Sequence, residues 1–399
     1  MKNNKKSPSR ILIIVTLMAF IAGICFTLNN IPLQNINSTT FYEVLYKDDM
    51  LTGFHSFLYR LLGKNEINNF SVVRDKDGYL YHANFWNNTD ISMKDAAQKI
   101  RALQDIFRNE ETGEVGTKVV VLMFPSKYDK QRSRGYEGLP YPDMNEYADD
   151  LLQYLRRYSV DYIDYRKWLK DSGRSSADMF YLSDSHWKVN TAFYATVYLA
   201  EYIKYRYGLD LDPDHIYLNS DNYLRTLYEE LFYGDYALKT ERYHTKADSY
   251  ELIIPGFDTD FSTVSESPGG RIVREQGLFS EVLTTRRYIN EKNEYEKEVY
   301  KTYLGSLHAR FHIENLLNPE GPKFLFMWNV WSPEVAAFTS SMAGTVDSLN
   351  IEYMDDARIK KELSENTYDY IFIGLHPDSL DIKHFPYDFK TKERQDNNE

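Results

Sequence analysis

Residues 181–187 read Tyr-Leu-Ser-Asp-Ser-His-Trp and stand directly before a strong helix pattern at 189–205. If this stretch is extended, side chains two residues apart point to the same side, so Asp184 and His186 face one cleft. An ionised Asp beside an imidazole fixes its tautomer and supports its charged form, as a general base requires. The structural alternative is that Ser183 or Asp184 caps the following helix and His186 is a satisfied, partly buried residue.

Apolar runs and helix patterns alternate on both sides of this stretch. Strand-like runs are expected at 118–124, 160–165, 324–328, 351–354 and 370–373, and helices at 93–107, 147–155, 189–205, after Pro333 and at 357–363. A hairpin signal precedes them, with two β-prone runs at 70–73 and 79–81 around an Asp/Gly turn. The alternation predicts an α/β domain with a parallel sheet, helices on both faces and a site at the carboxyl ends of the strands.

Residues 208–315 interrupt this alternation, because they are rich in Tyr, Asp and charged pairs. We expect them to form an inserted subdomain or lid of mixed α/β character. The expected segments are a basic cytoplasmic tail at 1–10, a transmembrane anchor at 11–28, a tether and leading helix at 29–68, the first part of the domain at 69–207, the insertion at 208–315, the second part of the domain at 316–380 and a charged tail at 381–399.

The amino-terminal segment has the layout of a signal anchor. Four basic residues, Lys2, Lys5, Lys6 and Arg10, precede an uncharged apolar run at 11–28. Eighteen residues at about 1.5 Å each span about 27 Å, close to the hydrocarbon thickness of a bilayer. No small-x-small cleavage site follows, so we expect an uncleaved anchor. The positive-inside rule then predicts a cytoplasmic amino terminus and an extracytoplasmic globular domain.

Composition restricts the chemistry and the partners. The 399 residues carry 47 basic and 59 acidic side chains, a formal charge of −12, which disfavours nucleic acid as a partner. The 34 tyrosines are suited to stacking and hydrogen bonding with a neutral polyol or sugar. Cys25 is the only cysteine and lies in the apolar run, so the exported part has neither disulfides nor a catalytic thiol.

Four stretches resemble, in order, the motifs of the AlgX/AlgJ alginate O-acetyltransferase group and the related DHHW proteins. Residues 78–81 resemble the family's "Gly-Trp-Leu-Phe" hairpin, and 119–127, which end in Pro-Ser-Lys, resemble its "Val-Pro-x-Lys" strand end. Residues 160–164 look like its "Gly-Val-x-Val-Asp" strand, and 181–187 look like its "Tyr-x-x-Thr-Asp-x-His-Trp" block. The resemblance implies an SGNH-hydrolase-like (flavodoxin-like) fold with permuted motif order, in which Asp184 orients His186 and His186 is the catalytic base.

The same resemblance implies a nucleophilic serine after the strand at 323–327, in a "Gly/Lys-Asp-Ser-Phe" motif. Here Asn329 occupies the Asp position and Val330 the nucleophile position. Valine has no lone pair with which to attack an acyl carbon. Ser332 is a weak alternative nucleophile, because a serine at a helix start is more often an N-cap and because it is displaced along the turn. Ser185 is not expected to contribute, since an extended segment points it away from both neighbours.

Other candidate residues lie beside these motifs. Trp187, Trp331 and Lys127 are candidate substrate-binding residues. Spacing alone places His308, His312 and nearby Glu314 in half a metal site, but no further ligand is identifiable. The Asp-Thr-Asp stretch at 258–260 lacks the glycine and terminal glutamate of a calcium loop. We therefore expect neither a metal nor a cofactor.

Two functions follow from these observations, beside a third alternative of a purely structural role in the cell envelope. The first is an extracytoplasmic O-acetyltransferase or esterase acting on a cell-surface polysaccharide, with a membrane-bound O-acyltransferase as acyl donor. In it, Asp184 orients His186, and His186 activates a hydroxyl of Ser332 or of the sugar itself. The second is a catalytically inactive relative that binds polysaccharide or scaffolds an acetylation complex, which the valine at position 330 favours.

Overall fold

The computed structural model describes most of the chain beyond residue 61, and the described residues are 62–67, 71–82, 92–108, 116–128, 144–174, 176–240, 245–294, 297–305, 308–328 and 333–380. The basic tail 1–10, the expected anchor 11–28, most of 29–68 and the charged tail 381–399 lie outside them. Within these described ranges no helix is both long and apolar enough to span a bilayer.

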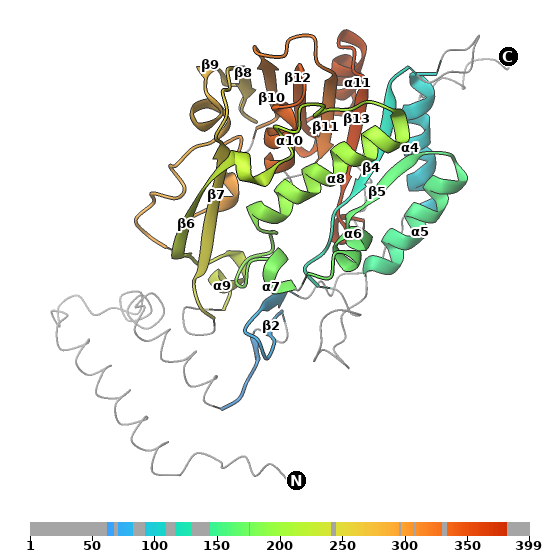
Figure 1. The fold of residues 1–399 in the computed structure, drawn as a ribbon. Coiled ribbons are helices and arrows are strands. Elements are labelled where there is room, and N and C mark those ends of the chain that lie inside the picture. Colours follow the sequence, from blue (N-terminus) through green and yellow to red (C-terminus); the bar gives the residue numbers. More distant parts are fainter. Residues whose placement is uncertain are drawn as a thin grey trace, which may run out of the picture.

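An eight-stranded sheet forms the centre of the molecule (Figure 1). Its order is β5 (Asp161–Asp164), β4 (Lys118–Met123), β13 (Tyr370–Leu375), β11 (Lys323–Trp328), β12 (Thr345–Asn350), β10 (Arg310–Asn315), β8 (Phe261–Glu266) and β9 (Ile272–Gly277). The first five strands are parallel, as the alternation predicts. The other three are antiparallel, so the whole sheet is mixed.

Region 208–315 contributes to two sheets. It supplies β8, β9 and β10 to the central sheet, where they pair antiparallel, and only β8 and β9 are joined by a short hairpin connection. It also forms a separate two-stranded ribbon of β6 (Tyr223–Phe232) and β7 (Asp248–Pro255), which lies below β8 and β9 in Figure 1.

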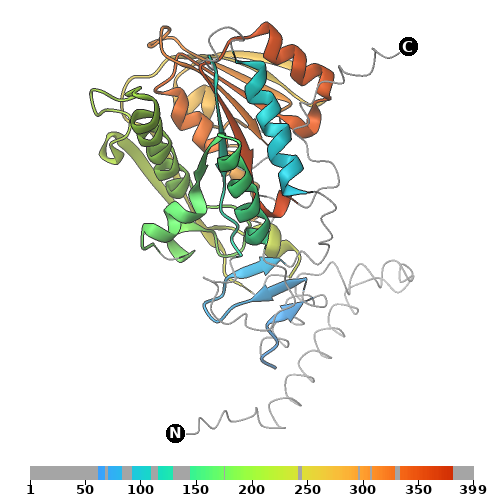
Figure 2. The same cartoon turned by 90° about the vertical axis from the view of Figure 1, so that its right-hand side faces the viewer.

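Alternating side chains of the parallel strands build two cores. In β4, Val120 and Leu122 pack with the helices α8 (Val189–Tyr207) and α10 (Pro333–Ser340). Val119 and Val121 pack on the other face with α4 (Met93–Ile106), α5 (Met144–Arg157) and α11 (Asp356–Glu365). Figures 1 and 2 show α8 and α4 on opposite sides of the sheet. This two-sided burial explains why β4 is continuously apolar.

One strand prediction is wrong. The apolar run at 351–354 is not a strand, since Ile351–Tyr353 form a short 3-10 turn and the strand is the preceding β12. Four of the six residues of β12 are polar, but its buried Asp347 accepts hydrogen bonds from Arg310, His312 and the Tyr368 hydroxyl. Because these partners are distant in sequence, local hydrophobicity does not reveal the strand.

The amino-terminal hairpin is confirmed as β2 (Val72–Arg74) and β3 (Leu80–His82), with β1 (Glu66–Ile67) on its edge. The remaining short elements are α6 (Tyr165–Asp171), α7 (Ser176–Met179), η2 (Ser220–Asn222), α9 (Asp235–Leu238), η3 (Phe279–Leu283), η4 (Val299–Lys301) and η6 (Pro377–Ser379). The parallel strands end at one edge of the sheet, where the connections after β4, β5 and β13 begin. The candidate site lies at this edge.

Candidate active site

The segment at 182–186 is a closed loop. An antiparallel bridge joins Phe180 to Trp187, and the Lys188 N–H donates to the Met179 carbonyl at 2.8 Å. The expectation of an extended segment is therefore wrong. α8 begins after Lys188 without a side-chain cap, so Asp184 does not serve as its N-cap.

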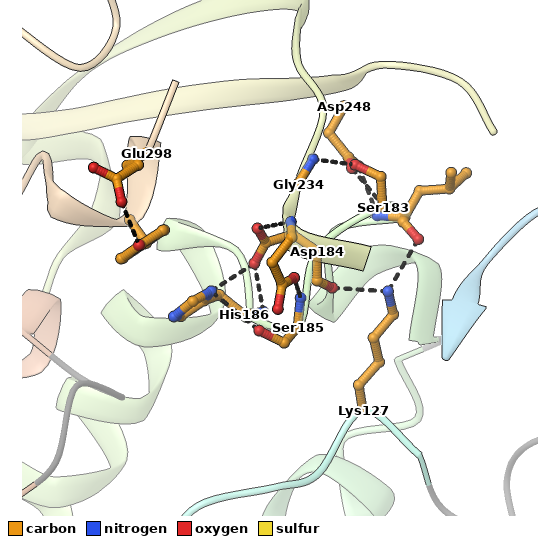
Figure 3. A network of polar contacts seen from close by, with 11 residues as sticks. Lys127, Ser183, Asp184, Ser185, His186, Gly234, Asp248 and Glu298 are labelled. Carbon is orange, nitrogen blue, oxygen red and sulfur yellow. Dashed lines mark hydrogen bonds and ion pairs between the residues drawn. The ribbon is translucent and has the colours of Figure 1, made fainter. Parts of the chain in front are cut away.

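Asp184 and His186 nevertheless meet, through a turn of the backbone around the carboxylate. Asp184 Oδ1 accepts the His186 N–H at 2.8 Å and also the Nδ1–H of the His186 ring at 2.5 Å (Figure 3). Asp184 is buried, whereas 14% of the His186 side chain is exposed. Since Nδ1 is held by the carboxylate, proton exchange with a substrate falls to Nε2.

Two residues from region 208–315, Asp235 and Asp248, hold this loop, and Figure 3 labels Asp248 beside Ser183. Asp248, at the start of β7, accepts the N–H groups of Leu182 and Ser183 at 2.6 and 2.7 Å. The Asp235 N–H donates to Asp184 Oδ2 at 3.1 Å, and Asp235 Oδ1 accepts the Ser185 N–H at 2.9 Å. Region 208–315 therefore packs against one side of the loop that carries Asp184 and His186.

Gly234 is required by close approach. A Cβ at this position would lie 2.2 Å from the Cβ and 2.6 Å from the Cα of Asp184. The Gly234 N–H donates to the Ser183 hydroxyl at 2.8 Å, which fixes the two segments against each other. Any side chain here displaces Asp184.

Lys127 supports the loop from the other side. Its Nζ donates to the carbonyls of Leu182 and Asp184 at 3.0 and 2.8 Å (Figure 3). The side chain is only 5% exposed, and this burial lowers the pKa of Lys127 to about 8, although Asp248 and Asp184 favour its charged form. The structure thus places Lys127 under the loop, where it positions Asp184, and not at a surface that meets substrate.

Trp187 is also placed in the interior. Its ring is 5% exposed and packs edge-on against Phe124 at 5.3 Å and Tyr165 at 6.1 Å. The buried indole therefore offers no exposed face to a sugar, and it packs in the core at the end of the 182–186 loop rather than at a surface that could contact substrate. The third substrate-binding candidate, Trp331, lies outside the described residues.

The imidazole of His186 stacks on Tyr300. The two rings are nearly parallel, with centroids 4.4 Å apart and an interplanar angle of 7°. The Tyr300 hydroxyl donates to Glu298 Oε1 at 3.0 Å, and Lys301 Nζ donates to the same oxygen at 2.7 Å. This second contribution from region 208–315 restrains the ring of His186.

The carboxylate of Asp184 makes the imidazole of His186 more basic. Burial disfavours the imidazolium of His186, but the Asp184 carboxylate and its hydrogen bond outweigh it and raise the pKa of His186. Burial likewise disfavours the carboxylate of Asp184, yet His186 and backbone donors hold its pKa below the ordinary value. For Asp235, burial and then repulsion by Asp184 raise the pKa.

Two further titratable groups lie in this environment. Glu334, in the first turn of α10, is buried, and the loss of solvation raises its pKa to about 7, while His186 opposes the rise. His376, after β13, donates from Nε2 to the Pro125 carbonyl at 3.1 Å and accepts the Asp378 N–H at Nδ1. Burial lowers the pKa of His376, so this second imidazole stays neutral.

The nucleophile positions from the sequence are not described by the structure. Asn329, Val330 and Ser332 lie outside the described residues. Ser185, which the extended reading excludes, does approach the ring, with Oγ 3.4 Å from His186 Nδ1. That nitrogen already donates to Asp184 at 2.5 Å, so Ser185 lies on the side opposite to Nε2.

Two of the weaker metal candidates meet, since His312 Nε2 lies 3.4 Å from Glu314 Oε1, and His312 Nδ1 donates to Asp347 at 2.9 Å. His308 Nε2 donates instead to the Leu304 carbonyl. Asp260 accepts a hydrogen bond from Gln276. No group of three or more ligand side chains suited to a metal occurs among the residues that the structure describes.

Sequence reasoning missed Gly234, Asp235, Asp248, Tyr300 and Glu334. A Gly-Asp pair before a short helix is the local signal for the first two. Tyr300 is one of 34 tyrosines, and Glu334 reads as an ordinary acidic residue in a first helical turn. Their function depends on contacts that no local pattern encodes.

Comparison with known proteins confirms the resemblance. Residues 72–228 match a family model described as "SGNH hydrolase-like domain, acetyltransferase AlgX". This match includes Lys127, Asp184 and His186 and ends before Gly234 and α10. No curated protein sequence matches the chain.

Solved structures share the fold at low identity. PatB1 of Bacillus cereus aligns with a TM-score of 0.59 and 14% identity, covering 80% of this chain and 99% of that one. A DHHW family protein from Eubacterium siraeum aligns with a TM-score of 0.56 and 15% identity, covering 79% of this chain and 93% of that one. The fold shared with these structures therefore extends well beyond the segment that matches the family model.

Proposed function

We propose that this chain acts in the O-acetylation of a cell-surface polysaccharide, as an extracytoplasmic acyltransferase or esterase with Asp184 and His186 as its orienting acid and base. The observation that carries the proposal is the preformed Asp184–His186 contact of 2.5 Å. It lies in a segment that matches an acetyltransferase family model, and Lys127, Asp235 and Asp248 hold its loop.

In this function His186 acts on the acceptor hydroxyl. Nε2 takes the proton of a sugar hydroxyl while the sugar oxygen bonds to the acyl carbon. The bond between that carbon and the donor oxygen then breaks, and the imidazolium gives its proton to the departing oxygen. Asp184 stabilises the imidazolium through Nδ1. Water in place of the sugar gives ester hydrolysis. Direct action on the acceptor suits a chain with valine at position 330.

A second candidate function is binding without catalysis. Val330 at the position where the family has its serine favours it. Such a protein keeps the cleft and holds polysaccharide, or scaffolds an acetylation complex, without forming an acyl-enzyme.

One experiment separates the two functions. Four forms of the exported part are incubated with 4-nitrophenyl acetate: the parent protein and the variants His186→Asn, Val330→Ser and His215→Asn. The last is the control, because His215 is an exposed histidine. His215 has a φ of 55°, a conformation that asparagine tolerates, so this control isolates the loss of one imidazole. Turnover in the parent that only His186→Asn removes supports the enzyme. Turnover only in Val330→Ser, or no turnover in any of the four proteins, overturns the enzyme function.

The location and the acyl donor belong to the same proposal. The basic and apolar layout of 1–28 supports a membrane anchor with the globular domain outside, and the resemblance supports a membrane-bound O-acyltransferase as donor. Protease added to intact cells should digest the globular domain. Protection of the domain until the cells are lysed contradicts the extracytoplasmic placement.

A further inference from the structure

A cleft of about 560 Å³ opens along the edge strand β5. Side chains of α5, α6 and α8 line it, and these elements are labelled in Figure 1. The cleft is separate from the Asp-His loop. Trp168 in the cleft contacts the buried Tyr165 ring at 6.0 Å, and Tyr165 in turn contacts Trp187 at the base of the loop at 6.1 Å.

Aromatic rings form one wall of this cleft. Trp168 of α6 and Tyr198 of α8 stack with centroids 5.7 Å apart and an interplanar angle of 28°, and Tyr202 continues the wall one helical turn further. All three rings are partly exposed. Trp and Tyr combine a rigid apolar face with a polar tip, which is the surface that stacks on the C–H face of a sugar while bonding its hydroxyls.

Fixed carboxylates form the floor. Asp164 caps α6 and accepts two bonds from the Arg166 guanidinium, at 2.9 and 3.0 Å. Arg166 is 8% exposed and also donates to Asp149 at 2.7 Å, so both carboxylates are held in place before any ligand arrives. Preorganised acceptors of this kind bind hydroxyl groups at low entropic cost.

The charges around the cleft offer no excess of positive charge. Three acidic side chains, Asp149, Asp164 and Asp171, and two basic ones, Arg156 and Lys167, line it, and Arg166 binds two of the carboxylates. An anionic ligand therefore gains no net attraction. An aromatic wall with bound carboxylates fits an uncharged sugar.

We propose that this cleft binds an uncharged pyranose unit of a glycan chain, stacked on Trp168 and hydrogen-bonded to the carboxylates of Asp164 and Asp171. The polymer rests on the function proposed above, but the sugar chemistry rests on the cleft alone. β4 and β5 are parallel, and Asp164 at the carboxyl end of β5 is in register with Met123 of β4, so the Asp164 end of the cleft lies at the carboxyl ends of the parallel strands.

Titration calorimetry of the full-length protein tests the proposal with cellotetraose, chitotetraose and the charged tetragalacturonate. At least one neutral tetrasaccharide should bind, and Trp168→Ala should weaken it about tenfold through the lost stacking. Asp171→Asn, which leaves the ring packing intact, should weaken it about threefold. Tyr205→Ala is the matched control, because Tyr205 lies on the same helix α8, is 87% exposed and does not line this cleft.

Several results overturn the proposal. They are absence of binding by both neutral sugars, stronger binding of tetragalacturonate, or equal weakening by Tyr205→Ala and Trp168→Ala. Loss of glycan binding in His186→Asn would move the sugar to the Asp-His loop and likewise overturn it. Retained binding in His186→Asn supports the cleft whether or not the parent turns over an ester, so the two proposals fail separately.

Discussion

Substitution of Gly234 by alanine should separate Asp184 from His186. The backbone at Gly234 has φ −79° and ψ −178°, which alanine adopts without strain, so the effect is purely steric. The new Cβ lies 2.2 Å from Asp184 Cβ, whereas ordinary contact begins near 3.4 Å, so Asp184 must move by about 1.2 Å. A shift of that size along the 2.5 Å contact lengthens it to about 3.7 Å, beyond hydrogen-bond reach.

Two measurements follow the consequence of this shift without requiring activity. The pKa of His186, followed by NMR of its ring nitrogens and assigned with His186→Asn, should fall from its raised value when Asp184 withdraws. Urea unfolding should show a loss of about 1–3 kcal/mol from overpacking. Gly269→Ala is the control, since its Cβ meets only Ser267 Oγ at 3.9 Å. A Gly234→Ala protein with the parent's His186 pKa and stability would refute the reasoning.

Three further predictions concern single groups of the site. Lys127→Met leaves two loop carbonyls and the buried carboxylate of Asp248 without their cation, and should lower the free energy of unfolding by about 3 kcal/mol in urea; a loss below about 1 kcal/mol contradicts a structural role. Tyr300→Ala should lower kcat/KM for the acetyl ester about tenfold by releasing the His186 ring, while Tyr300→Phe, which keeps the stack, should not. Burial raises the pKa of Glu334 in the folded state from 4.5 to about 7. Between these pH values the folded state keeps this proton while the unfolded state releases it, so stability is lost as the pH rises. Urea unfolding at pH 5 and pH 7 should show about 2 kcal/mol more loss in the parent than in Glu334→Gln, and equal losses would show that Glu334 titrates normally.

Local sequence patterns were sufficient to predict several helices and strands. The apolar run of β4 is buried on both faces, and the apolar spacing of α8 matches a helix packed on the sheet, so residue type and period suffice for both. The hairpin of β2 and β3 follows from its Asp/Gly turn, where Gly78 has φ +96°. The block at 181–187 likewise identified the SGNH-like fold before any geometry was known.

Where partners are distant in sequence, the same reasoning failed or gave the right contact for the wrong reason. β12 was missed because buried Asp347 is made tolerable by Arg310, His312 and Tyr368, which no local window contains. The meeting of Asp184 with His186 was expected from an extended strand, but an Asp-centred turn in a closed loop produces it.

The Asp-His pair that the sequence marked at 181–187 is therefore only part of the site. Its loop is held by Lys127, Gly234, Asp235 and Asp248, and Tyr300 stacks on the imidazole. The sequence by itself determined the strand and helix alternation, the family block and the two residues that carry the proposed chemistry, because each is encoded within a few neighbouring positions. Only the tertiary structure decided which surface is buried, which groups are charged and what orients the imidazole. Burial and hydrogen bonding depend on residues that lie far apart in the sequence and that folding brings together.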